Sequence, residues 1–273
     1  MIPYELIMSS ASRPHLLRAV FAAFVRHLDQ LPERVIVHED VCRPDADVRA
    51  AIAESLPPGV AFTYLEDSPP IRHGRSIHRL LGESRTEFVL YGQDDDAPVR
   101  RIPVGACLAV MEHHGLNAVR FNKRTTMAAH SGWPKREMTF FAADMTVTTL
   151  TLAEKLHFQI GAWRRSWVKA ATDWWEETYP GSLAEHGEVK INNALSGVIP
   201  EFGATKVIDV PSPGCHDDHA SRIAHCRTYI WGPIGEPPFH EHLGWRQEDW
   251  RDNRANRSGN ELRARLAEEE RKT

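Results

Sequence analysis

The chain of 273 residues lacks the features that mark membrane, secreted or nucleic-acid-binding proteins. No apolar run approaches the roughly 18 residues of a membrane span, and the first residues lack the basic start and long apolar core of a signal peptide. The four cysteines are scattered without a CxxC pair, which favours free thiols over a disulfide scaffold. A net charge of −4 gives no overall basic footprint for nucleic acid. We expect a soluble, cytoplasmic protein with no membrane partner.

Strand-like and helix-like segments alternate through the first 96 residues. Short apolar runs predict buried strands, and apolar residues at helical spacing predict the helices between them. The predicted strands are 4–8, 35–37, 60–65 and 87–92, and the predicted helices begin near 14, 46 and 74. We expect Ser12 to cap the first helix. This alternation indicates an α/β fold with a mainly parallel sheet flanked by helices.

Polar residues stand at the ends of three of these strands. Ser9 and Ser10 end the first strand, Glu39 and Asp40 end the second, and Asp94–Asp96, here called the acidic triplet, end the fourth. The carboxyl ends of parallel strands share one edge of a sheet, where open α/β sheets bind nucleotides. We therefore expect these side chains to line a nucleotide site.

The acidic triplet also predicts a metal. Three adjacent carboxylates repel one another, and their burial at a strand end is costly unless a cation gathers them. Magnesium and manganese take one or two protein carboxylates and fill their other positions with water and phosphate oxygens. The triplet therefore indicates a divalent cation and a phosphorylated donor. The alternative is a solvated acidic turn.

The second half of the chain is less regular. Residues 100–136 hold seven Lys or Arg and one acid, which predicts either an anion-binding surface or a solvated basic one. Residues 163–175 hold four tryptophans, which indicate either core packing or a stacking platform for a sugar or base. Within this stretch, Trp163 and Arg164 are the residues predicted to bind a substrate.

We expect three regions. Residues 1–105 are expected to form an α/β half, to which the resemblance described next assigns nucleotide-sugar binding, and residues 106–250 the other half of the same compact domain, to which it assigns acceptor binding. Residues 251–273 form a charged helix that is either a solvated tail or a contact between copies.

The first 100 residues resemble the family-2-like glycosyltransferases of the GT-A fold. The polar first strand end, the acidic second strand end, the Gly-Arg helix start and the strand running into the acidic triplet carry the likeness. The resemblance implies that Asp94 and Asp96 bind Mn²⁺ or Mg²⁺, which holds the diphosphate of a nucleotide sugar. It implies that Asp95 faces the ribose or sugar and that Asp40 or Glu39 contacts the base.

The same resemblance suggests further site residues. Ser9, Ser10 and Arg13 at the first strand end, and Arg75 in the Gly-containing loop, are expected at the donor. An inverting enzyme needs a carboxylate base, for which Glu188 is the first candidate and Glu185 the second. The alternative is that both are acids favoured at a helix start.

The family often adds a late histidine to the metal, and His216 is the candidate here. Two alternatives remain for this region. One is a surface histidine cluster. The other is a structural zinc site, although its spacing matches no standard finger; its ligands would be Cys215, His219, His225 and Cys226.

The resemblance implies a metal-dependent transfer of a hexosyl or pentosyl group from a nucleotide sugar to a hydroxyl acceptor, with inversion. The acceptor classes considered are an anionic saccharide and a modified DNA base such as a hydroxymethylated pyrimidine. One alternative is a nucleotidyltransferase acting on sugar phosphates, but the loop 9–13 is not Gly-rich. The other is a non-catalytic nucleotide-sugar-binding protein.

Overall fold

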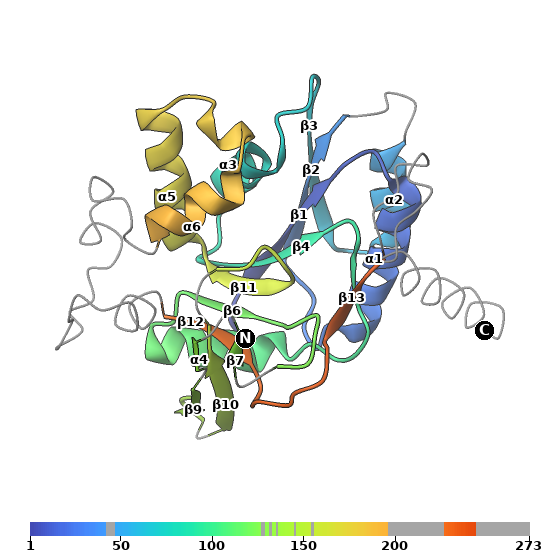
Figure 1. The fold of residues 1–273 in the computed structure, drawn as a ribbon. Coiled ribbons are helices and arrows are strands. Elements are labelled where there is room, and N and C mark those ends of the chain that lie inside the picture. Colours follow the sequence, from blue (N-terminus) through green and yellow to red (C-terminus); the bar gives the residue numbers. More distant parts are fainter. Residues whose placement is uncertain are drawn as a thin grey trace.

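The computed structural model of the protein describes residues 1–41, 47–126, 129–130, 133–134, 136–144, 146–153, 156–195 and 227–243. A nine-stranded sheet forms its centre (Figure 1). The strand order is β3–β2–β1–β4–β11–β6–β12–β10–β9. Its strands in chain order are β1 (Tyr4–Ser10), β2 (Arg34–Asp40), β3 (Ala61–Asp67), β4 (Phe88–Gln93), β6 (Ala118–Arg120), β9 (Glu137–Phe141), β10 (Val147–Leu152), β11 (Gly161–Arg164) and β12 (Thr228–Trp231).

Four short strands form two further pairs, β5 (Asp96–Pro98) with β13 (His240–His242) and β7 (Ala129–His130) with β8 (Trp133–Pro134). The helices are α1 (Pro14–His27), α2 (Val48–Ser55), α3 (His73–Glu83), α4 (Val104–His114), α5 (Arg165–Thr178), the 3₁₀ turn η1 (Ser182–Ala184) and α6 (Gly187–Leu195).

The sheet is mainly parallel, as the sequence predicts. Strands β3, β2, β1 and β4 pair in parallel. Among the described strands of this sheet, β10 and β11 run against the other seven. All four predicted strands are present, and β1, β2 and β3 extend further toward the polar residues at their carboxyl ends. One continuous sheet therefore joins the two predicted halves of the chain.

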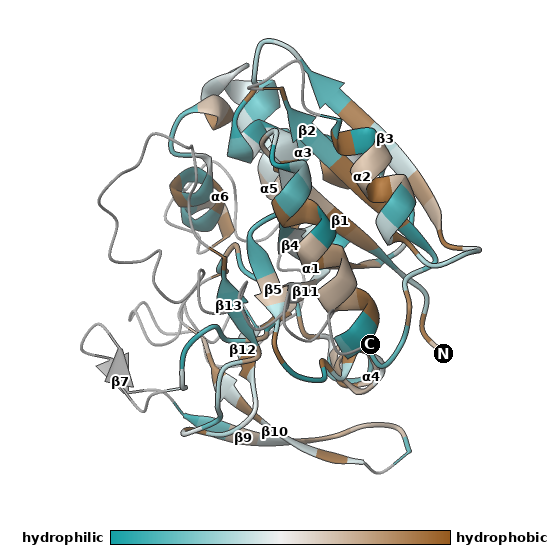
Figure 2. Ribbon diagram, turned by 90° about the vertical axis from the view of Figure 1, so that its right-hand side faces the viewer, coloured by the Kyte–Doolittle hydropathy of each residue, from teal (hydrophilic) through white to brown (hydrophobic). Residues whose placement is uncertain are grey.

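The sheet separates two apolar cores. Leu6 and Met8 of β1 pack in a core with residues of α1, α2 and α4, whereas Ile7 packs in a second core with residues of α3, α5 and α6. Figure 1 shows α1 and α2 on one side and α3, α5 and α6 on the other, and Figure 2 shows apolar residues along α1, α2 and β1. Strands covered on both faces read as continuous apolar runs, which explains the clear sequence signal of β1.

The β9–β10 hairpin projects from the end of the sheet (Figures 1 and 2) and exposes Met138, Phe141 and Val147. Among the described residues, none of the helices combines the length and the apolar character that crossing a bilayer requires.

Two glycines allow α3 and α6 to meet by their backbones. A Cβ atom on Gly74 would lie 2.7 Å from the Cα of Gly187, and one on Gly187 would lie 2.5 Å from the Cα of Gly74. Both separations are too short for real Cβ atoms, so neither position can accept a side chain without displacing backbone. This contact brings the first turns of the two helices together.

We predict that Gly187→Ala destabilises the fold, because overpacking of this kind costs about 1–3 kcal/mol. Gly82→Ala on α3 is the matched control, since a Cβ there meets nothing within 4 Å, and replacing a helical glycine stabilises by up to about 1 kcal/mol. Urea unfolding measures both changes. Equal midpoints for the two variants would contradict the close contact.

Candidate functional site

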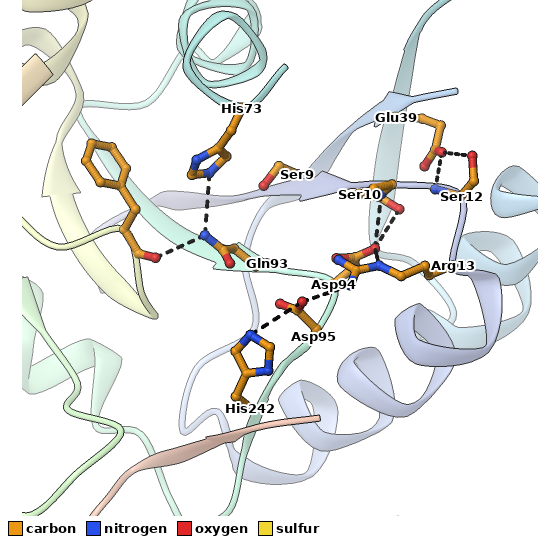
Figure 3. Close-up of polar contacts among 12 residues, drawn as sticks. Ser9, Ser10, Ser12, Arg13, Glu39, His73, Gln93, Asp94, Asp95 and His242 are labelled. Carbon is orange, nitrogen blue, oxygen red and sulfur yellow. Dashed lines mark hydrogen bonds and ion pairs between the residues drawn. The ribbon is translucent and has the colours of Figure 1, made fainter. Parts of the chain in front are cut away.

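The polar ends of β1, β2 and β4 meet at the carboxyl edge of the parallel strands (Figure 3). Ser10 pairs in register with Glu39, and Ser9 pairs with Gln93. The acidic triplet follows β4 directly. The prediction that these strand ends share one edge of the sheet is confirmed.

All three side chains of the acidic triplet are buried. Asp94 and Asp96 are 1% exposed and Asp95 is 4% exposed, so a solvated acidic turn is excluded. Burial raises the pKa of Asp95, and the charge of Asp94 adds to the rise. Carboxylates this deeply buried require cations or hydrogen-bond donors around them.

Arg13 supplies one of those cations. Its Nε donates a hydrogen bond to Oδ2 of Asp94 at 3.0 Å, and its Nη1 donates to Oδ2 of Asp95 at 2.9 Å. Its Nη2 also pairs with Oδ1 of Asp94. Burial opposes the charge on Arg13, but the two carboxylates raise its pKa. The guanidinium therefore stays charged and bridges the first two members of the triplet.

Asp94 is also held by the turn between β1 and α1. Its Oδ2 accepts hydrogen bonds from Oγ of Ser10 at 3.2 Å and from the backbone N–H of Ala11 at 3.1 Å. Together with Arg13, these donors surround the Asp94 carboxylate (Figure 3). Asp94 therefore ties the β1–α1 turn to the end of β4.

The predicted capping role of Ser12 is wrong. The N-cap of α1 is Arg13, and Ser12 instead points both its backbone N–H and its hydroxyl at Oε1 of Glu39, the latter at 2.8 Å. Oε2 of Glu39 is buried and has no hydrogen-bond partner among the described residues. Burial raises the pKa of Glu39. A carboxylate oxygen at the strand edge is thus left as an acceptor.

Strand β13 brings two histidines to the acidic triplet. It pairs with β5, and the backbone N–H of Leu243 donates to the carbonyl of Asp95 at 2.6 Å. Nδ1 of the fully buried His240 lies 3.6 Å from Oδ1 of Asp96, and Nε2 of His242 lies 3.6 Å from Oδ2 of Asp95. Burial opposes ionisation of Asp96, but His240 and His242 hold its pKa below the ordinary value.

These residues fit a divalent cation. Asp95, Asp96 and His242 each offer a ligand atom, and the three atoms lie within 4.8 Å of one another. Oδ1 of Asp95, Oδ1 of Asp96 and both ring nitrogens of His240 are buried without a hydrogen-bond partner among the described residues. Carboxylate oxygens with an imidazole nitrogen suit Mn²⁺ and similar divalent ions.

The sequence reasoning missed both histidines of β13. A usable signal was present, because His240-Glu241-His242 places two histidines two residues apart, on one face of a strand. His216, the predicted histidine ligand, and the alternative zinc ligands lie outside the described residues.

Glu188 lies in the first turn of α6 and its side chain is 51% exposed. Its Oε1 lies 2.9 Å from Nδ1 of His73, the first residue of α3. Nε2 of His73 in turn lies 2.5 Å from the hydroxyl of Tyr91 on β4. Glu185 is exposed at the end of η1. Of the two predicted bases, Glu188 is therefore the one tied to the strand edge.

Two other predicted donor residues make contacts within the protein. Oδ1 of Asp40 accepts the backbone N–H of Ile71 at 2.9 Å. Nε of Arg75 lies 3.6 Å from Oε1 of Glu176 on α5. Arg75 therefore links two helices, and these contacts give it no link to the acidic triplet.

The structure does not bring Trp163 or Arg164 to this edge. Trp163 is fully buried and stacks on Tyr91 at a ring distance of 4.3 Å, so it belongs to the core. Because β11 runs antiparallel to β4, Arg164 pairs with Phe88 at the opposite end of β4 from the triplet. There Nη1 of Arg164 donates to Oε1 of Glu87 at 2.8 Å.

Comparison with known proteins identifies the fold. No protein-family model matches the chain, and no curated protein matches its sequence significantly. Residues 1–349 of S. aureus TarS superpose with a TM-score of 0.50 and 12% identity, over 88% of this chain and 60% of that one. A longer TarS structure gives the same TM-score, identity and coverage of this chain, over 36% of its own length. The mannosyltransferase PcManGT of Pyrobaculum calidifontis gives a TM-score of 0.49 at 12% identity, over 84% and 57% of the two chains.

The chain therefore has a GT-A fold. It spans 60% and 36% of the lengths of the two TarS structures.

We predict that Arg13→Met destabilises the protein by about 3–5 kcal/mol, because it leaves two buried carboxylates without their cation. Adding Asp94→Asn should restore part of that stability, since it removes one of the two buried charges that lack a cation. Urea unfolding of both single variants and of the double variant measures the coupling. Simple additivity of the two losses would contradict the ion pair described here.

Glu39 should make stability depend on pH. Because its folded-state pKa lies above the ordinary value of 4.5, its contribution is fully present below that value and is lost as pH rises through the folded-state pKa. Glu39→Gln should therefore be more stable than the wild type at neutral pH and about equal below pH ~4. Glu54→Gln, an exposed glutamate of α2, is the control. Parallel pH profiles for Glu39→Gln and the wild type would contradict the shift.

Proposed function

We propose that the protein is a metal-dependent glycosyltransferase that moves a sugar from a nucleoside diphosphate sugar to a hydroxyl acceptor, with inversion. The observation that carries the proposal is the convergence, at the carboxyl edge of the sheet, of buried carboxylate and imidazole atoms that have no hydrogen-bond partner among the described residues. Open α/β sheets bind their ligands at this edge, and the fold is one that glycosyltransferases use.

In this proposal, Asp95, Asp96 and His242 hold the divalent cation, with His240 beside them. Asp95 replaces Asp94 as a proposed ligand, because Arg13 and the β1–α1 turn already occupy the Asp94 carboxylate. When bound, the cation supplies positive charge that stabilises the departing diphosphate.

The nucleoside is proposed to lie along the ends of β1 and β2. The unpartnered Oε2 of Glu39 is a suitable acceptor for an N–H group of the base. Ser9, at the neighbouring end of β1, offers a hydroxyl on the same edge. Arg13, whose side chain is 16% exposed, places a positive charge at the same edge, where it pairs with Asp94 and Asp95.

Glu188 is proposed as the base that removes the proton from the acceptor hydroxyl. It is half-exposed, and its contact with His73 ties it to the same edge.

We propose a saccharide or a hydroxymethylated pyrimidine as the acceptor class. Within the basic stretch 100–136, Arg100 pairs with Glu236 and Arg120 is buried, whereas Arg101 is 79% exposed in its side chain.

Thermal unfolding with nucleotide sugars, with and without Mn²⁺, tests the proposal. A ligand at 100 times its Kd adds about 2.7 kcal/mol of stability. UDP-GlcNAc and GDP-mannose are the first donors to test, because TarS and PcManGT have been solved with them. A stabilisation that requires both Mn²⁺ and one nucleotide sugar is expected. Its absence for every nucleotide sugar would overturn the proposal.

Asp96→Asn and His242→Ala should each abolish the Mn²⁺-dependent part of this shift, because each removes a ligand atom. Asp144→Asn is the control, since Asp144 is an exposed carboxylate in the β9–β10 turn. Donor transfer assayed in parallel separates an enzyme from a binding protein. An unchanged shift in both ligand variants would place the cation elsewhere.

A further inference from the structure

A series of polar contacts links the sheet edge to Glu188: hydrogen bonds as far as His73, and an ion pair between His73 and Glu188. Ser9 Oγ and Gln93 Nε2 each lie 3.2 Å from the hydroxyl of Tyr91. That hydroxyl lies 2.5 Å from Nε2 of His73, and Nδ1 of His73 lies 2.9 Å from Oε1 of Glu188. Figure 3 shows His73 reaching down to Gln93 at the end of β4, next to the acidic triplet. These contacts thus run from the carboxyl edge of the sheet to Glu188, the proposed base.

The buried half of this series consists of hydrogen bonds. Nε2 of His73 and the hydroxyl of Tyr91 share one of them. Burial raises the pKa of Tyr91 far above its ordinary value, which keeps that hydroxyl protonated. Gln93 Nε2 donates to the Tyr91 oxygen, and the hydroxyls of Ser9 and Tyr91 share a further hydrogen bond.

Ring packing holds the buried end of this series of contacts in place. Tyr91 is fully buried, stacked on Trp163 at 4.3 Å and inclined by 13°. The His73 ring packs edge-on against Phe158, with centroids 5.8 Å apart. Gln93 donates to the backbone carbonyl of Phe158 at 3.0 Å, which fixes the orientation of its amide. The imidazole is therefore held in one orientation from two sides.

The other end of this series of contacts is accessible to solvent. The side chain of His73 is 30% exposed and that of Glu188 is 51% exposed. Oε1 of Glu188 makes the ion-pair contact with His73, and Oε2 is the second oxygen of this half-exposed carboxylate. The glycine contact between α3 and α6 sets this geometry, because Gly74 follows His73 and Gly187 precedes Glu188.

We infer that His73 is a positioning residue for Glu188, an inference that rests on the proposed function. The contact of its ring with Oε1 orients the carboxylate and leaves Oε2 to take the proton of the acceptor hydroxyl. As that O–H bond breaks, the acceptor oxygen bonds to the anomeric carbon, and the bond from that carbon to the diphosphate oxygen breaks with its electron pair leaving on the diphosphate.

The test compares His73→Ala, His73→Asn and Glu188→Gln in donor binding and in transfer kinetics. His73→Ala should lower kcat about 100-fold, as small misplacements of a reacting group do, with the donor-induced thermal shift unchanged. His73→Asn should recover most of that loss, because its amide N–H can replace Nδ1. Glu188→Gln should lower kcat by about 10²–10⁴, and adding His73→Ala to it should cost little more.

His78→Ala is the matched control. His78 lies on the same helix, is 33% exposed against 30% for His73, and faces Asp173 of α5. Unfolding midpoints of all variants identify any that fail to fold, and His73→Asn then carries the comparison.

The outcomes separate the two proposals. A normal donor shift in His73→Ala with wild-type kcat would overturn the role of His73 alone, as would a loss of donor binding in that variant. Multiplicative losses in the double variant would also overturn it. No Mn²⁺-dependent donor shift in the wild type would overturn the proposed function and this role with it.

Discussion

The burial of three consecutive carboxylates is the constraint on which the site depends. Each member of the acidic triplet needs a partner, and the chain supplies them from three places. Arg13 and the β1–α1 turn hold Asp94, Arg13 also reaches Asp95, and β13 sets His240 and His242 against Asp96 and Asp95. The need to neutralise these charges explains why the β1–α1 turn and β13 both lie at this edge of the sheet.

The same constraint divides the triplet by function. Asp94 is enclosed by hydrogen-bond donors of the protein, whereas Asp95 and Asp96 each keep an oxygen without a hydrogen-bond partner among the described residues. Three chemically identical residues thus differ in what they can bind, because the strand geometry turns each toward a different neighbour. A motif of three aspartates does not by itself reveal this division.

Local sequence patterns predicted the fold of the first 100 residues well. The apolar runs of β1, β2 and β4 and the polar residues that end them are signals carried within a few residues, and the structure confirms both. Contacts between distant segments were not predictable in this way. The pairing of β5 with β13 is one example. Another is the antiparallel insertion of β11, which turns Trp163 into the core and Arg164 to the far end of β4. Ser12 looked like a helix cap because its competing partner, Glu39, lies on another strand.

The position of β13 late in the sequence has a consequence for the order in which the protein folds. Asp96 and His242 lie far apart in the sequence, and such non-local pairings form slowly because a long loop must close first. Arg13, in contrast, precedes the triplet and is available as soon as β1 and β4 meet. During synthesis the sheet edge can therefore form with its carboxylates partly neutralised, while the residues proposed to hold the cation come together only after residue 242 has left the ribosome. Under that proposal, a divalent ion added in refolding experiments would act on the last step of folding rather than on its nucleation.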